Sequence, residues 1–327
     1  MIQIEDVYKA VREIISEGEI YAVGGCVRDY LLGLKPKDWD FCTNLTPEQM
    51  RPLIEKAGRH VYGIGEKFGT LGFKVPVLEY NDYDYDDGWG PQWHARETFV
   101  YVEVTTYRTE KYEQGSRKPE VKFGTDLKED LKRRDFTINS LAFDGNEIID
   151  LFAGELDLNH KLIKSVGEPK QMINDDPLRI LRAIRFSVQL DFDIEQNLEK
   201  HLRRFCTKLF DVAIERQLVE LDKMFSIDAK KSLEKLYSIG YIKYFLPEIM
   251  GDENLKMKIP SSINNHKSED ELWKQILSQT GEEVVYSEIG EITVTNSQHK
   301  RTRFLNRGIA ARFKFSNARR QAVTGDK

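Results

Sequence analysis

The chain has little of what marks a secreted or membrane-bound protein. Its three cysteines, Cys26, Cys42 and Cys206, are scattered, and no histidine lies near them at the spacing of metal ligands. This pattern argues against a disulfide framework and a zinc site, and it favours a reducing cytoplasm. No apolar run approaches twenty residues, so we expect no membrane-spanning helix. The N-terminal string MIQIEDVYKAVREI is typical of an amphipathic helix, not of a secretory signal.

Acidic residues are also missing from one long segment. Between Ile292 and Gly325 there is no Asp or Glu, while eight lysines and arginines occur there, although the whole chain has a net charge of −5. Such a basic segment on an acidic protein is typical of a phosphate-binding surface, and equally of a solvated tail. With 327 residues, 40% hydrophobic and 31% charged, the chain is long enough for two or three compact units.

The residues from Tyr21 to Asp40 carry the first chemical signal. Residues 21–23 are apolar and predict a short buried strand, and Gly24-Gly25 predicts a tight loop before a helix over 27–34. Glycines at that place leave backbone N–H groups free to bind phosphate. Gly-Gly before a helix is also typical of a plain turn.

Two aspartates close this stretch. If Asp38 and Asp40 lie on a strand, their carboxylates share one face, because side chains two apart on a strand point the same way. Such a pair is costly unless a divalent cation lies between the carboxylates. An Asp-x-Asp pair is also typical of a solvated strand end. Together with the glycine loop, it indicates a nucleoside-triphosphate site.

A third carboxylate lies on the clearest strand in the sequence. Residues 98–107, TFVYVEVTTY, alternate and are β-branched and aromatic, with Glu103 in the middle. An acid there is normally on the solvent face, but beside an Asp-x-Asp strand Glu103 would complete a metal site. The acidic, aromatic segment 79–97 before it predicts a surface loop or an inserted hairpin, whose rings either stack on bases or carry no role.

Three polar residues follow in the string LKRRDFTINSLAFD. We expect a helix from Arg133 that buries Phe136, Ile138 and Leu141, so that Arg134, Asp135 and Asn139 face a sugar and its phosphates. The following residues, 148–169, are typical of a small β-hairpin.

The segment NDDPLRILRAIRF over 174–186 carries the second signal. Asp176 before a proline predicts a helix N-cap, which is also a purely structural explanation for it. Asp176 and Arg179 lie three apart, so they can present an acceptor and a fork of donors to a base edge. Arg182 and Arg185 share the same polar face. Beyond Asp191 the pattern is helical and highly charged.

Five strings of the chain resemble one family in order and approximate spacing. The chain resembles the class II CCA-adding tRNA nucleotidyltransferases and bacterial poly(A) polymerases over residues 21–225, and the matching strings are GGCVRDYLLG…DWD, RRDFTIN, DLFAGELDL, DDPLRILRAIRF and VAIERQLVELDKMF. The resemblance implies an α+β fold: a polymerase-β-like nucleotidyltransferase head over 1–150, a neck over 151–225, and an all-α region over 226–327.

The resemblance also implies roles for single residues. Asp38, Asp40 and Glu103 would hold two Mg²⁺ ions, or Mn²⁺, since their ligands are hard oxygens. The triphosphate would lie on Gly24, Gly25 and Arg28. The remaining residues would contact the sugar and phosphates (Arg134, Asp135, Asn139), select CTP or ATP (Asp175, Asp176, Arg179), and contact phosphates (Arg182, Arg185). The family often has Glu where this chain has Asp175.

The implied activity is template-independent addition of CCA to the tRNA 3′ end from CTP and ATP. A poly(A) polymerase and an enzyme restricted to CC or A share these motifs and stay open. The intact carboxylates argue against a catalytically inactive RNA-binding relative, and the helical region after Asp191 argues against a small acceptor molecule. RNA and nucleoside triphosphates are the expected partners, without a membrane. The sequence does not indicate an oligomeric state, and the short C-terminal region leaves open how tRNA would be measured.

Overall fold

The computed structural model describes residues 2–63, 65–83, 92–111, 120–124, 126–245, 285–286 and 292–293. The chain divides into two compact units, residues 1–167 and 168–327. The division therefore falls after Gly167, whereas the sequence predicts a domain limit at residue 150. The predicted limits at 150 and 225 stay predictions.

The first unit is a mixed sheet with helices around it. Its helices are α1 (Ile4–Ile14), α2 (Gly25–Leu31), α3 (Pro47–Lys56), α4 (Leu127–Lys132) and α5 (Gly154–Asn159), with 3₁₀ turns η1 (Glu66–Phe68) and η2 (Thr137–Asn139). Its strands are β1 (Ile20–Val23), β2 (Trp39–Thr43), β3 (Thr70–Tyr83), β4 (Gln92–Thr106), β5 (Arg108–Lys111), β6 (Glu120–Phe123), β7 (Leu141–Phe143), β8 (Ile148–Asp150) and β9 (Leu162–Ile163).

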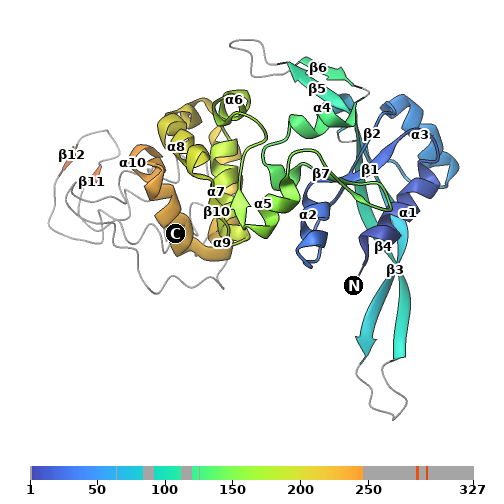
Figure 1. Cartoon of the computed structure of the whole chain (residues 1–327). Coiled ribbons are helices and arrows are strands. Elements are labelled where there is room, and N and C mark those ends of the chain that lie inside the picture. The colour runs from blue at the N-terminus through green and yellow to red at the C-terminus, as the bar shows by residue number, and fades with distance from the viewer. Residues whose placement is uncertain are drawn as a thin grey trace. The chain divides into compact units, whose positions relative to one another are not determined.

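Six of these strands form one sheet in the order β3-β4-β2-β1-β7-β8 (Figure 1). Strands β2 and β4 run parallel, and the other neighbours are antiparallel. Val23 of β1 and Cys42 of β2 pack with Tyr107, Leu131 and Ala142 in a buried cluster. The sheet with its helices confirms the predicted α+β head.

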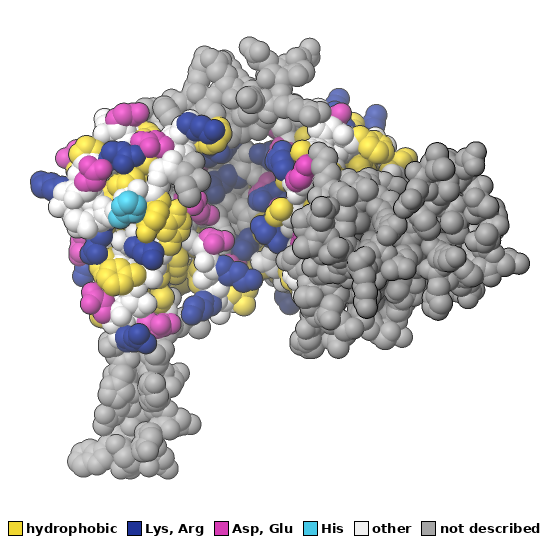
Figure 2. All heavy atoms as spheres, turned by 180° about the vertical axis from the view of Figure 1, so that it is seen from behind, with side chains coloured by type: hydrophobic (Ala, Val, Ile, Leu, Met, Phe, Trp, Pro, Cys, Tyr) yellow, Lys and Arg dark blue, Asp and Glu magenta, His cyan; other side chains and the backbone are white. Residues whose placement is uncertain are grey.

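Strands β3 and β4 form a long antiparallel hairpin, paired from Thr70 opposite Thr105 to Tyr83 opposite Gln92. Its outer part projects from the sheet as a two-stranded arm (Figure 1). The segment 79–97 is thus a hairpin rather than a loop in the residues described, and 84–91 lie outside them. Figure 2 shows hydrophobic side chains gathered among lysines and arginines on one face of the first unit.

The prediction of a helix that begins at Arg133 is wrong. Helix α4 begins earlier, where the side chain of Asp126 accepts a hydrogen bond from the Lys128 backbone N–H at 2.9 Å, and it ends at Lys132. The Asp135 carboxylate accepts hydrogen bonds from the Phe136 backbone N–H and from Asn139. Short polar side chains that bond nearby groups in this way compete with a helix. The chain therefore passes into the 3₁₀ turn η2 and then into β7.

The hairpin predicted over 148–169 is also wrong. Strand β8 pairs with β7, and helix α5 separates it from β9. The cause is Asp150, whose carboxylate accepts hydrogen bonds from the backbone N–H groups of Gly154 and Glu155 at 2.9 and 3.0 Å. These contacts satisfy the first donors of a helix, so α5 forms where a turn was expected.

The described part of the second unit is mainly helical, as predicted. Its elements are α6 (Pro169–Asp175), α7 (Arg179–Gln189), β10 (Asp193–Ile194), α8 (Gln196–Phe205), η3 (Cys206–Asp211), α9 (Ile214–Ser238), α10 (Tyr241–Phe245), β11 (Val285–Tyr286) and β12 (Ile292–Thr293). Helices α7 and α9 pack together, and Ile180, Leu181 and Ile184, which recur at helical spacing, are buried. The sequence also predicts a helix over 269–277, but that range and the basic segment beyond Thr293 lie outside the described residues. Within them, no helix is both long enough and apolar enough to cross a membrane.

Candidate active site

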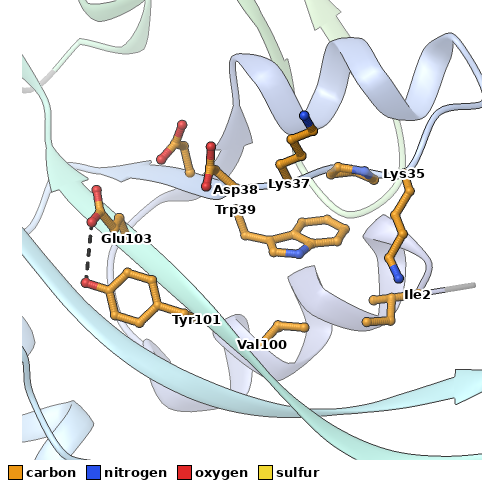
Figure 3. Close-up of a pocket in the computed structure, with 10 residues that line it drawn as sticks. Ile2, Lys35, Lys37, Asp38, Trp39, Val100, Tyr101 and Glu103 are labelled. Atoms are coloured by element: carbon orange, nitrogen blue, oxygen red, sulfur yellow. Dashed lines mark hydrogen bonds between the residues drawn. The ribbon is translucent and has the colours of Figure 1, made fainter. Parts of the chain in front are cut away.

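Three carboxylates meet in one pocket of the first unit. Asp40 is the second residue of β2, and Asp38 immediately precedes that strand. The parallel register places Asp40 opposite Glu103 of β4. The side chains of Asp38, Asp40 and Glu103 line a pocket of about 490 Å³ (Figure 3). The sheet therefore brings together the three acids that the sequence singles out.

Asp40 lies in a setting that opposes its negative charge. Burial, opposed by Arg134 and reinforced by the Glu103 and Asp38 carboxylates, raises the pKa of Asp40 to about 6. Three carboxylates in one pocket supply the hard oxygen ligands that Mg²⁺ and Mn²⁺ prefer. The donor set therefore fits a divalent cation.

The three carboxylates do not yet converge on one point. Within the described residues, no group of three or more His, Cys, Asp or Glu is arranged to hold a metal ion. Glu103 accepts a hydrogen bond from the Tyr101 hydroxyl at 3.3 Å, and Asp38 is exposed (Figure 3). The pocket is thus suited to a cation by its chemistry, without the ligand arrangement of an assembled site.

Gly24 and Arg134 lie against each other beside these acids. Gly24 has a φ of 76° and precedes α2, as the sequence predicts. A β-carbon on Gly24 would come within 2.9 Å of Arg134 Nη1, so the glycine is what lets the guanidinium approach. Arg134 Nη2 donates to the buried Asp130 at 3.2 Å, and Arg134 Nε is buried with no hydrogen-bond partner among the described residues. These contacts thus hold the Arg134 guanidinium beside the predicted glycine loop.

Arg28, Asn139 and Asp135 are joined to one another. Arg28 Nη1 donates to Asn139 Oδ1 at 2.7 Å, and Asn139 Nδ2 donates to Asp135 Oδ1 at 3.0 Å. Arg28 also donates to Asp29. All three predicted residues are buried. The chain of hydrogen bonds ties α2 to η2, and the nucleotide contacts predicted for these residues stay predictions.

The residues predicted to select the nucleotide, Asp175, Asp176 and Arg179, lie in the second unit. Asp176 Oδ1 accepts from the Leu178 backbone N–H at 3.1 Å, as a cap does, although helix α7 begins only at Arg179. Asp176 Oδ2 accepts from Arg216 of α9 at 2.9 Å. Asp175 accepts from Gln171 at 2.6 Å. Asp176 is thus held both by the backbone of its own turn and by Arg216 of α9.

Arg185 of α7 is buried, whereas Arg179 and Arg182 are half-buried, and the phosphate contact predicted for Arg185 stays a prediction. Its side chain is buried, and Nε donates to Glu220 of α9 at 2.6 Å while Nη1 donates to Gln189 at 2.8 Å. A buried guanidinium needs such partners, because an unpaired buried charge is costly. Arg182 lies over the Phe186 ring at 5.4 Å.

Two residues of the site escaped the sequence reasoning. Asp130 binds Arg133 Nη2 at 2.7 Å and Arg134 Nη2 at 3.2 Å, and its spacing of three and four residues before them is a signal for such pairing. Tyr101 contacts Glu103, and its place two residues earlier on the same strand face could have indicated this.

Comparison with known proteins gives matches over most of the chain. The poly(A) polymerase head domain model matches residues 20–164, and a model described as the probable RNA- and SrmB-binding site of polymerase A matches residues 191–252. Together the two models span more than half of the chain.

The chain is similar to the CCA-adding enzyme of Lactococcus lactis, with 34% identity over 274 residues (82% of this chain and 63% of that protein). It is 38% identical to the CCA-adding enzyme of Enterococcus faecalis over 225 residues, which are 68% of this chain and 49% of that protein. The chain thus spans about half to two-thirds of the length of these curated relatives.

Solved structures match in the same way. The crystal structure of the Bacillus stearothermophilus CCA-adding enzyme in complex with CTP matches with a TM-score of 0.72 and 25% identity, over 98% of this chain and 68% of that one. A tRNA nucleotidyltransferase complexed with a primer tRNA and an incoming ATP analog matches with a TM-score of 0.57 and 26% identity, over 75% and 64% of the two chains. By its ordered motifs, its fold and these relatives, the chain belongs to the family of CCA-adding tRNA nucleotidyltransferases and bacterial poly(A) polymerases.

Proposed function

We propose that the protein adds CCA to the 3′ end of tRNA, using CTP and ATP and no nucleic-acid template. The observation that carries this proposal is the pairing of Asp40 with Glu103 across two parallel strands, in the pocket that Asp38 completes. Relatives named CCA-adding enzymes, and a structural neighbour solved with CTP, support this choice of reaction and substrates.

Asp38, Asp40 and Glu103 would hold magnesium, or manganese in its place. Such an ion, when bound, lowers the pKa of an RNA 3′-hydroxyl and neutralises charge on the triphosphate. The three carboxylates would also orient the RNA 3′ end, because they determine where the ion that neutralises the triphosphate lies. The raised pKa of Asp40 reflects an electrostatic cost that a cation in the pocket would relieve.

Arg134 and the Gly24-Gly25 loop would receive the triphosphate. Arg134 supports this because its Nε has no hydrogen-bond partner in the described part of the chain and its Nη1 lies against Gly24. Arg28, Asn139 and Asp135 would shape the loop through their hydrogen bonds, in addition to the contacts predicted for them.

Asp175, Asp176 and Arg179 would read the base of the incoming nucleotide. A carboxylate accepts from an amino group and a guanidinium donates to a ring nitrogen or a carbonyl, so this set can replace a template base. The hydrogen bond from Arg216 to Asp176 keeps one of these carboxylates in place. Arg182 and Arg185 are the candidates for phosphate contacts on α7.

Poly(A) addition is a second candidate, because the matching head-domain model is that of poly(A) polymerase. We also propose a cytoplasmic location, because the three scattered cysteines favour a reducing compartment.

One assay separates these reactions. A tRNA transcript that ends at the discriminator base is incubated with Mg²⁺ and labelled CTP and ATP, separately and together, and the products are sized. Three added nucleotides that need both triphosphates support the proposal. Long tails from ATP alone indicate a poly(A) polymerase, and no addition to any RNA end contradicts both. Asp40→Asn should abolish incorporation, while Asp211→Asn, a change at an exposed aspartate, should not.

A further inference from the structure

One face of strand β4 carries large rings that are open to solvent. Phe99, Tyr101 and Glu103 alternate along the strand, so their side chains share a face. Phe99 is 55% exposed and Tyr101 is 41% exposed, while Val102 and Val104 on the opposite face are buried. An antiparallel pair such as β3 and β4 commonly has one apolar face and one polar face. The packing of the sheet therefore does not explain the exposed rings.

The chain after α3 extends this row of rings. Tyr62 pairs with Gly72 of β3 through two backbone hydrogen bonds of 2.7 and 3.0 Å. The Tyr62 ring lies 5.7 Å from the Tyr101 ring, and the His60 ring lies 4.7 Å from the Tyr62 ring, each pair edge to face. The Tyr101 hydroxyl in turn donates to Glu103 (Figure 3). The row of rings therefore leads to one of the three carboxylates.

Two cations flank the rings. The Arg59 guanidinium lies over the Phe99 ring, 5.8 Å from its centroid, and the Arg59 backbone N–H donates to Ile54 at 3.1 Å where α3 ends. Lys74 of β3 is exposed and shares the face of the rings. Within the described ranges neither cation has an ion-pair partner, and the buried Arg59 Nε has no hydrogen-bond partner. Because an unpaired, partly buried charge is costly, the setting of Arg59 favours an anion supplied by a ligand.

Unpaired RNA has the two features that such a surface can bind. Bases stack on aromatic side chains whatever their identity, and cations beside the rings hold the phosphates. A protein partner would favour a patch whose centre has few charges. The next residue outward on the same face, Glu97, is an exposed acid that repels phosphate, so the surface ends there. We call this surface the ring platform, and its residues are Arg59, His60, Tyr62, Lys74, Phe99 and Tyr101.

We propose that the ring platform binds the second and third nucleotides from the 3′ end of the acceptor RNA, with their bases on the Phe99 and Tyr101 rings and a phosphate at Arg59. The proposal rests on the proposed function, which brings the RNA end to the carboxylates. Phe99 lies four residues before Glu103, about 14 Å along an extended strand. An unstacked RNA strand, whose phosphates are farther apart than the about 3.4 Å of a stacked one, covers this distance with about two or three nucleotides.

The ring platform would act on a growing RNA end. A tRNA that ends at the discriminator base has that base alone unpaired, whereas a tRNA that ends in CC has two more unpaired nucleotides. Only the longer end can extend from the carboxylates to Phe99. The platform should therefore contribute little to addition of the first C and most to addition of the final A.

The test uses the full chain and two tRNA transcripts, one that ends at the discriminator base and one that ends in CC. Phe99→Leu keeps an apolar side chain but removes the flat ring. We expect it to raise the Kd and KM for the CC-ended transcript about tenfold, the scale of one lost stack, and to change the values for the shorter transcript and the KM for ATP by less than about twofold. Phe99→Trp keeps a ring and should stay within about twofold of the wild type throughout. Arg59→Ala should flatten the salt dependence of binding of the CC-ended transcript by about 0.7 in the log–log slope.

A matched control is Lys67→Ala/Phe68→Ala, which removes another exposed ring with a lysine 5.0 Å from its centroid, in the same unit but outside the ring platform. It should leave all these values within about twofold of the wild type, as surface substitutions usually do. Thermal unfolding checks that each variant is folded. A CC-ended transcript with 4-thiouridine at the discriminator position should crosslink to the peptide that contains Phe99.

The outcomes separate the two proposals. If the wild type extends RNA and Phe99→Leu binds and extends the CC-ended transcript equally well, the platform is wrong, the function stands, and a protein partner is left for the exposed rings. An equal loss with both transcripts, or a rise in the KM for ATP, would place the effect at the carboxylates and also overturn the platform. If the wild type extends no RNA, the proposed function fails. The crosslink then decides the platform, which falls if the peptide that contains Phe99 is not labelled.

Discussion

The hydroxyl of Tyr101 lies over Gly72, at the position that a β-carbon on that glycine would occupy. Gly72 of β3 is opposite Glu103 of β4, and the Tyr101 hydroxyl donates to Glu103 Oε1 at 3.3 Å. The missing side chain at Gly72 therefore makes room for the group that contacts one of the three carboxylates. A glycine inside a strand often marks such a close approach.

Gly72→Ala should displace the Tyr101 ring and release Glu103. Because small displacements of positioned groups are costly in catalysis, we expect nucleotide incorporation to fall on the order of tenfold or more. Tyr101→Phe removes only the hydrogen bond and should have a smaller effect in the same direction. Single-turnover incorporation measures both, and thermal unfolding checks that each variant is folded. Full activity in Gly72→Ala would show that the contact does not position Glu103.

Asp130→Asn should destabilise the first unit. The Asp130 side chain is 1% exposed and binds both Arg133 and Arg134, so the change leaves two charges without their shared counter-ion. Removing one partner of a buried pair costs about 3 kcal/mol. Denaturant unfolding measures the loss. The matched change Glu129→Gln breaks an exposed pair with Lys132 and should cost less than about 1 kcal/mol.

The same carboxylate gives this loss a pH dependence. Burial raises the pKa of Asp130, but the attraction of Arg134 and Arg133 outweighs it, and the pKa is lowered from 3.8. A lowered pKa stabilises the folded state above about pH 3.8, and this contribution is lost as the pH falls through the lower value. The difference in unfolding free energy between wild type and Asp130→Asn should therefore be full at pH 7 and shrink below about pH 3.8. A difference that grows in acid would contradict the sign of the shift.

Arg216→Ala should loosen the choice between CTP and ATP. Arg216 donates to Asp176 at 2.9 Å, and since both side chains are partly exposed, the change should cost less than about 1 kcal/mol of stability. We expect misincorporation to rise several-fold, with Arg216→Lys restoring part of the discrimination. Arg203→Ala, which removes a comparable pair with Glu199 on α8, is the control. Equal misincorporation in the two alanine variants would show that Arg216 does not contribute to the choice between CTP and ATP.

The cysteines should be inert in the folded protein. Burial raises the pKa of both Cys26 and Cys206 to about 12, and it raises that of Cys42 as well. The thiolate is the reactive form, so at pH 8 all three stay neutral and inaccessible. A thiol reagent such as DTNB should label none of them before unfolding and all three after it. Rapid labelling of one cysteine in the native state would show that its surroundings open.

The sequence predicted those elements whose signals are local. Gly24-Gly25 marks the turn into α2, and alternation over 98–107 marks the inner part of β4. The prediction failed where side chains bond to nearby groups, as Asp135 and Asp150 do, because periodicity does not report such contacts. The sequence also did not predict the ion pair of Arg185 with Glu220, because Glu220 lies on another helix. The other residues that line the carboxylate pocket come from segments that become neighbours only in the fold, so no single stretch of sequence predicts the pocket.

The parallel pairing of β2 with β4 has a consequence for how the protein folds. Parallel neighbours need a long crossover, here the chain from α3 through β3, and contacts so distant in sequence form late because loop closure is costly. Asp40 and Glu103 therefore come together only after much of the first unit has collapsed. The two carboxylates then repel each other only in a nearly complete fold, and the rest of that fold keeps them together. A divalent cation that binds only this folded state would also shift the folding equilibrium toward it, so that the same ion would act as a stabiliser as well as a cofactor.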